Sequence, residues 1–300
     1  MTIGQAWQLL KESVAAWIDD YASSMGAALA YYTVFSIAPL LLIVIAVAGF
    51  FFGSAAAEQA IASELEGLVG HDAAIAVRGL LESASSPSGS VISALAGLGV
   101  LLIGATTVFA ELQDALDRIW RAPAAAQRSG LWSLIRARLL SFGMILGIGF
   151  LLTVSLVVSA LLAALGKWWG DWLVGWQTVF QGIDFVLSLA LVTVIFALIY
   201  KVMPRVNVRW HDVWIGAGVT ALLFTVGKIL IGLYLGRSGI ESAFGAAGSL
   251  IVLLAWVYYA AQIFLLGAEF TWVYAHRYGS RQGESLARAG VIPSRRDVEG

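Results

Sequence analysis

The sequence predicts an all-α integral membrane protein with six transmembrane helices. Sixty per cent of its 300 residues are apolar and only 12% are charged. A helix of about 20 residues crosses a hydrocarbon core of about 30 Å, and in lipid each backbone N–H must bond within its own segment. Six runs meet this length: Ala27–Phe52, Val91–Ala110, Leu139–Leu165, Val179–Ile199, Val213–Leu235 and Ala243–Tyr274. Asp184, Lys228 and Glu269 are the only charged residues within them.

The distribution of basic residues predicts the orientation of the chain. Fourteen of the eighteen Lys and Arg residues lie in the N-terminal segment, after the second run, after the fourth run and after the sixth. Because short loops rich in Lys and Arg stay on the cytoplasmic side, we expect both termini in the cytoplasm. The expected location is the bacterial cytoplasmic (inner) membrane, as a multi-pass protein whose first partner is the lipid bilayer.

The chain divides into three predicted parts. Residues 1–24 form an amphipathic helix expected to lie on the inner leaflet, with a groove of a soluble partner as the alternative. The apolar residues that recur in it at intervals of three or four are Ile3, Trp7, Leu10, Val14, Trp17 and Tyr21. Residues 25–276 form the transmembrane domain, in which the outer connection 54–90 carries two short helices. Residues 277–300 form a basic cytoplasmic tail.

Lys228 is the first candidate functional residue. An ionisable side chain at the centre of a transmembrane helix costs about 2.5–3.5 kcal/mol on insertion scales, and it often marks a functional site. Seven residues separate Lys228 from Leu235, which is about 10 Å along a helix, so its stem could also reach the outer headgroups. The sequence leaves a cavity-facing role and this headgroup contact equally open. We expect Lys228 not to meet Glu269, because helix direction puts them at different depths.

Glu269 and Gln262 are the candidates in the last run. Glu269 lies in the inner third of this span, where pairing with Arg136, Arg138 or Lys201 is favoured over a proton-relay role. Gln262 lies nearer the middle of the membrane. For this amide, an interhelical hydrogen bond is favoured over binding of a ligand.

Glycines and one proline are expected to shape the spans. Pro39 removes one backbone hydrogen bond from the first span and is expected to kink it. Small residues let transmembrane helices approach closely. They are Gly143, Gly147 and Gly149 in the third run and Gly216, Gly218, Gly227 and Gly232 in the fifth. Close packing within one chain is favoured, and a homo-oligomer interface is the alternative.

The sequence lacks the residue patterns of a hydrolytic enzyme. It has no cysteine, and its three histidines are spread over separate segments, so no metal-ligand set is expected. It has neither a phosphate-binding glycine loop nor a nucleophile elbow. We therefore expect no cofactor. We also expect no nucleic-acid partner, because membrane orientation already accounts for the cytoplasmic arginines.

Several strings resemble motifs of the YihY/virulence factor BrkB family. They are residues 28–32 and 35–39 in the first run, 115–120 after the second, 204–208 with Trp210 before the fifth, and 244–249 with 266–269 in the last. They occur in the family's order and cover nearly the whole chain. The resemblance implies a six-helix inner-membrane architecture, in agreement with the hydropathy.

The resemblance also implies candidate site residues. The family motifs fall on Tyr31, Tyr32 and Pro39 in the first span, on Glu269 in the last, and on Asp117, Arg118, Trp120, Pro204 and Asn207 at the cytoplasmic face. Lys228 falls where family members tend to carry a polar or basic residue. Members have long carried the label ribonuclease BN, but this chain shows no acid–base pair or metal-ligand set that could cut a phosphodiester.

Three functions follow as hypotheses. The leading one is a permease-like transporter or export protein for a small molecule or a lipid, because glycine-rich helices, a kinked span and an intramembrane charge suggest a cavity. The second is an envelope scaffold that transports nothing. The third is the ribonuclease of the family label, which the sequence disfavours.

Overall fold

The computed structural model describes residues 3–53, 107–123, 176–237 and 248–282, with scattered residues between 58 and 81 and between 143 and 151. Regular structure in this part of the chain is entirely helical, as predicted. The long helices are α1 (Ile3–Asp19), α2 (Ala22–Phe52), α7 (Trp176–Val202), α8 (Trp210–Arg237) and α10 (Gly248–Arg277). Residues 107–119 are also helical.

Four of the six apolar runs coincide with these helices. The first, fourth, fifth and sixth runs correspond to α2, α7, α8 and α10, whereas most of the second and third runs lie outside the described residues. Within the described residues, three segments are long and apolar enough to cross a membrane: Phe185–Val202, Trp210–Tyr234 and Leu250–Arg277. The chain is therefore an α-helical membrane protein. The two short helices predicted for 54–90 lie mostly outside the described residues.

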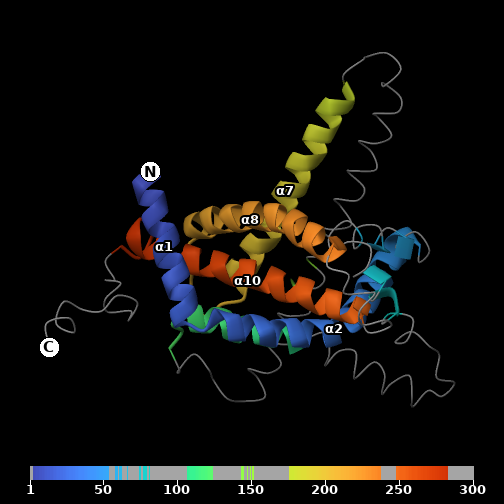
Figure 1. Cartoon of the computed structure of the whole chain (residues 1–300), viewed down its shortest axis with the longest axis horizontal. Helices are drawn as coiled ribbons and strands as arrows, with labels where there is room; N and C mark the ends of the chain where they lie inside the picture. Colours follow the sequence, from blue (N-terminus) through green and yellow to red (C-terminus); the bar gives the residue numbers. More distant parts are fainter. Residues whose placement is uncertain are drawn as a thin grey trace, which may run out of the picture.

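Helix α10 lies between α2 and α8, and α1 crosses one end of this layer (Figure 1). Helix α7 packs on α8 and then leans away from the other helices. The end crossed by α1 holds the N-termini of α2 and α8 and the C-terminus of α10. We call it the α1 end. It is the end that the positive charges predict to be cytoplasmic.

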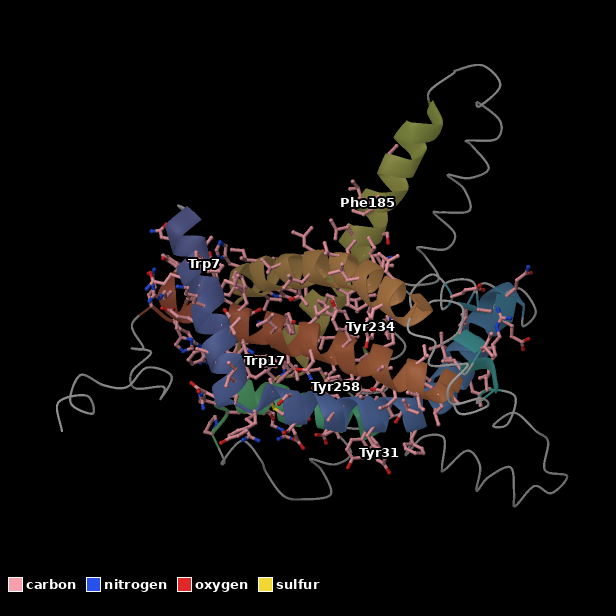
Figure 2. All side chains as sticks on the ribbon, viewed as in Figure 1. Trp7, Trp17, Tyr31, Phe185, Tyr234 and Tyr258 are labelled. Carbon is pink, nitrogen blue, oxygen red and sulfur yellow. The ribbon has the colours of Figure 1, made fainter. Side chains whose placement is uncertain are left out.

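Helix α1 packs on α10 through a face of small and aliphatic residues. Leu9, Ser13 and Ala16 are fully buried. Most of the predicted apolar stripe points outward instead: Trp7, Leu10, Val14 and Tyr21 are exposed, together with Ile18. Trp17 is the exception, because it is partly buried against the core (Figure 2). An apolar outer stripe suits a helix on a lipid surface, and that placement stays a prediction.

Small residues bring α8 and α10 together, as favoured from the sequence. A Cβ at Gly216 would collide with Thr271 of α10, and a Cβ at Gly267 would collide with Thr220 of α8. Gly227 lies against Ile263 and Tyr259. As the residue numbers increase along α8, the numbers of the residues that they contact in α10 decrease. The two helices are therefore antiparallel. Close approach of this kind supplies the packing contacts that stabilise helices in lipid.

Helix α2 continues as an α-helix through Pro39. The proline therefore does not end the helix, although it removes one backbone donor. Whether this proline bends the span stays a prediction.

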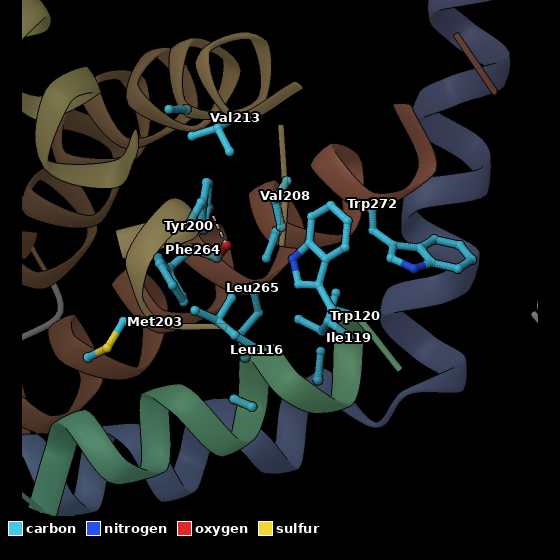
Figure 3. Packing of buried hydrophobic residues seen from close by; sticks show 14 of the residues in the cluster. Leu116, Ile119, Trp120, Tyr200, Met203, Val208, Val213, Phe264, Leu265 and Trp272 are labelled. Carbon is cyan, nitrogen blue, oxygen red and sulfur yellow. Dashed lines mark hydrogen bonds between the residues drawn. The ribbon is translucent and has the colours of Figure 1, made fainter. Parts of the chain in front are cut away.

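The largest buried cluster lies at the α1 end (Figure 3). Trp120 and Trp272 are almost completely buried there, and Tyr200 is fully buried. The Tyr200 hydroxyl donates to the backbone oxygen of Phe264 at 2.7 Å. Large aromatic rings contribute much of the apolar area buried at this end, and polar residues are embedded in it.

Candidate functional site

Asp117 anchors the segment between α7 and α8 at the α1 end. It is 5% exposed, and its Oδ1 accepts the backbone N–H of Arg205 at 2.6 Å. The Arg205 guanidinium lies 3.0 Å from Asp117 Oδ2. Gln113 adds a third link by donating to the backbone oxygen of Met203 at 2.8 Å. These bonds join two motifs that lie 88 residues apart in the sequence.

The other residues of these motifs have different surroundings. Trp120 and Pro204 are buried, whereas Arg118 and Asn207 are exposed. Asn207 Oδ1 accepts from Lys201 Nζ at 3.0 Å, and Lys201 Nζ also donates to the backbone oxygen of Val208. The motif predicted for the cytoplasmic face is therefore a folded junction, in which only some side chains reach the surface.

Burial sets the electrostatics of this junction. Burial raises the pKa of Asp117 above its usual range, and the backbone N–H and guanidinium of Arg205 oppose the shift. Burial also raises the pKa of Glu111, and the nearby charge of Asp114 adds to that shift. A buried carboxylate needs its partners more than an exposed one does, so Arg205 holds Asp117 in place.

A second cluster joins α1, α10 and the chain after residue 119. Glu269 of α10 is fully buried, and neither carboxylate oxygen has a hydrogen-bond partner among the described residues. The Asp20 carboxyl lies close to it, without a hydrogen bond of ordinary geometry. Arg121 lies 3.2 Å from Asp20 Oδ1. Burial raises the pKa of Asp20, and Arg121 opposes the shift.

The described residues test only one of the three partners expected for Glu269. Lys201 is not its partner, because its ammonium binds Asn207 and Val208 instead. Arg136 and Arg138 lie outside the described residues. The neighbouring group is a carboxyl, Asp20, which the sequence did not suggest because it belongs to the turn after the amphipathic helix.

Lys228 and Glu269 are well separated. Contacts of Gly227 with Ile263 and Tyr259 place Lys228 at the level of those residues in α10. At 1.5 Å per residue, that level is roughly 10 Å or more from Glu269 along the axis. The different depths expected from the sequence are therefore present. Lys228 is half-buried and makes no hydrogen bond or ion pair with another described residue.

The remaining candidates lie along α2 and its contact with α10. Gln262 Nε2 donates to the backbone oxygen of Ser23 at 3.4 Å, which is the interhelical role favoured from the sequence. Tyr31 is exposed, and its ring lies edge-on to that of Tyr32 at 5.5 Å. These aromatic rings are not part of the buried clusters at the α1 end.

Sequence reasoning missed a polar contact that closes the C-terminal end of α10. Asp212 is 1% exposed and accepts from both the backbone N–H and the hydroxyl of Ser280. Arg277 forms an ion pair with Glu12 of α1. The sequence feature that could have indicated Asp212 is its position in the first turn of a helix, where acidic residues are favoured. Among the described residues, no group of three or more His, Asp or Glu side chains could hold a metal ion.

Comparisons with known proteins agree on the family. The family model described as "Virulence factor BrkB" matches residues 14–290. A "UPF0761 membrane protein" of Legionella pneumophila (strain Corby) is 27% identical over 90% of this chain and 62% of its own length. A "UPF0761 membrane protein" of Rhodospirillum centenum is 26% identical over 88% of this chain and 56% of its own length.

A shorter match is more similar in sequence. A "UPF0761 membrane protein" of Tolumonas auensis is 43% identical over 75 residues, which are 25% of each chain. The chain thus spans less than two thirds of the length of these curated relatives. No solved structure matches the chain.

Proposed function

Because this chain belongs to the Virulence factor BrkB family of membrane proteins, we propose that it is a permease-like transporter or export protein for a small molecule or a lipid. It works in the bacterial cytoplasmic membrane, crosses it six times and keeps both termini in the cytoplasm. The lipid bilayer is its constant partner. The proposal includes no cofactor, no enzymatic activity and no nucleic-acid partner.

The proposal rests on the position of the charged residue Lys228. It lies within the apolar helix α8, half-buried and without an ionic partner among the described residues. Within the described part of the chain, no atom of another segment lies within 4 Å of a Cβ at Gly218 or Gly232 of α8. A charge kept at this depth is costly for a helix that serves packing alone. It suits a helix that presents a cation to an anionic substrate or a phosphate headgroup.

Substitution of Lys228 tests this function. In a strain lacking the gene, we expect Lys228→Met to insert normally and to fail in restoring the wild-type lipid and metabolite profile. Lys228→Arg keeps the charge and is expected to retain rescue, as is Lys11→Met on the exposed face of α1. Full rescue by Lys228→Met would contradict transport through this residue and favour the scaffold hypothesis.

Reconstitution separates the two substrate classes. Purified protein in phospholipid vesicles is expected either to translocate a fluorescent phospholipid between leaflets or to restore export of the metabolite that accumulates in the deletion strain. Lys228→Met is expected to remove whichever activity is found. The ribonuclease alternative is tested on the same sample by incubation with RNA and Mg²⁺, Mn²⁺ or Zn²⁺, and metal-dependent cleavage lost in a point variant would establish it.

The proposed topology is tested with single cysteines, because the natural chain contains none. We expect a membrane-impermeant maleimide to label Gln59→Cys in intact spheroplasts. Gly4→Cys and Gln282→Cys are expected to react only after the membrane is opened. All three positions are exposed in the structure. Labelling of either terminal cysteine from outside would contradict the assignment of both termini to the cytoplasm.

A further inference from the structure

In the described part of the chain, two residues other than glycine have left-handed backbone conformations. Both lie at the cluster of Asp20, Arg121 and Glu269. They are Tyr21, with φ 55°, and Arg121, with φ 52°. Such conformations cost on the order of 1 kcal/mol for ordinary residues, and they persist where the surrounding structure requires them. Because both conformations occur next to Asp20, we infer that the contacts around Asp20 require them.

Arg121 shows why the strained backbone is kept. The N–H of Ala122 bonds to the backbone oxygen of Asp117, so Arg121 occupies the helix-ending position that usually holds glycine. Glycine would relieve the backbone but would have no side chain. The guanidinium of Arg121 instead lies over the Trp272 ring, 5.8 Å from its centre, and reaches Asp20.

Among the described residues, the charges in this cluster do not balance. Asp20 and Glu269 are two buried carboxyls, and Arg121 is the nearby cation. The other charged groups that act on Asp20 from the described residues are Asp19 and Arg118, and both of these are exposed. Two adjacent carboxylates cannot both keep their charge cheaply when they are removed from water. A single proton shared between them would leave one negative charge for Arg121.

We propose that Asp20 and Glu269 form a binding site for one proton, which holds the turn between α1 and α2 against α10. Proton release leaves two carboxylates facing each other with one guanidinium. Their repulsion then weakens the docking of Asp20, which lies in the two-residue turn between α1 and α2. The site is a proton-controlled latch at the α1 end, and it does not depend on what the protein transports.

The burial of Asp20 agrees with this assignment. Burial raises the pKa of Asp20 even though Arg121 lies beside it. A folded-state pKa above the unfolded value means that the folded protein binds the proton more tightly. The resulting stabilisation is present at low pH and decreases as pH rises through the folded-state pKa.

Infrared spectroscopy of the purified protein tests the site directly. We expect the wild type to show the carbonyl stretch of a buried protonated carboxyl, which disappears as pH rises. Glu269→Gln and Asp20→Asn are each expected to abolish it, because either variant leaves one carboxylate opposite Arg121. Asp19→Asn, which changes the adjacent exposed acid, is expected to retain it. No such band in the wild type, or a band that survives either cluster variant, would overturn the proposal.

A cysteine probe tests the mechanical consequence. Ala22 is fully buried at the start of α2, and Gly4 is exposed. We expect the labelling rate of Ala22→Cys, divided by that of Gly4→Cys at the same pH, to rise several-fold as the proton is released. Glu269→Gln keeps the site neutral and is expected to remove this rise while still folding. A ratio that does not change with pH, or that changes equally in Glu269→Gln, would contradict the latch.

Discussion

Replacement of Gly267 by valine is expected to prevent α8 and α10 from packing. A Cβ at this position would occupy the place of the Thr220 hydroxyl and would stand 2.7 Å from the Tyr200 hydroxyl. Both hydroxyls are already committed, because Thr220 bonds to the backbone oxygen of Gly216 and Tyr200 bonds to that of Phe264. The backbones must therefore separate along their whole contact. We expect a loss of about 3 kcal/mol or more and little folded protein.

Gly218→Val is the matched control for this prediction. Gly218 lies in the first half of α8, and no atom of another described segment lies within 4 Å of its Cβ position. The change in side chain is the same, so a difference between the variants reports helix contact and not the effect of valine on a helix. Thermal unfolding in detergent and the yield of monodisperse protein give the comparison. Equal behaviour of the two variants would contradict the packing described for α8 and α10.

Removal of the Asp117 carboxylate is expected to detach the segment between α7 and α8. Asp117→Ala deletes the acceptor of the Arg205 backbone N–H and the partner of its guanidinium. Hydrogen bonds to a buried charged group contribute about 1.5–3 kcal/mol, so we expect destabilisation by about 2–3 kcal/mol. Intrinsic tryptophan fluorescence during thermal unfolding is a suitable measurement, because Trp120 lies next to this junction.

Asp114→Ala tests whether charge alone explains that effect. Asp114 lies 3.7 Å from the same guanidinium, but its side chain is 66% exposed. Exposed ion pairs contribute little, and we expect a change of less than about 1 kcal/mol. If Asp114→Ala destabilised the protein as much as Asp117→Ala, the buried hydrogen bond would not be the main contribution.

The candidate site was predictable only in part. Glu269 and Asp117 stand out in the sequence, the first as a charge in an apolar run and the second by its motif. Their partners do not stand out. Arg205 lies in a motif and Asp20 looks like an ordinary loop residue, but nothing local indicates that one meets Asp117 and the other lies beside Glu269. Such pairs depend on which helix ends are adjacent, and that is a property of the packed molecule.

Helix α1 also shows which features the sequence predicts and which depend on packing. Its periodicity indicates a helix with an apolar stripe, but a second face of smaller residues also repeats at helical spacing. Only packing shows that Leu9 and Ala16 face α10 while Trp7 and Ile18 face outward. The sequence places Trp17 in the apolar stripe, but in the structure it is partly buried against the core.

The sequence by itself determined the membrane class, the helical state and most boundaries of the described long helices. These follow from local chemistry, because an apolar segment in lipid must satisfy its own backbone bonds over a length set by the bilayer. Tertiary structure alone decided the partners of the buried charges. A buried carboxyl takes its environment from whichever distant residues the packed helices bring to it, and no local pattern specifies them.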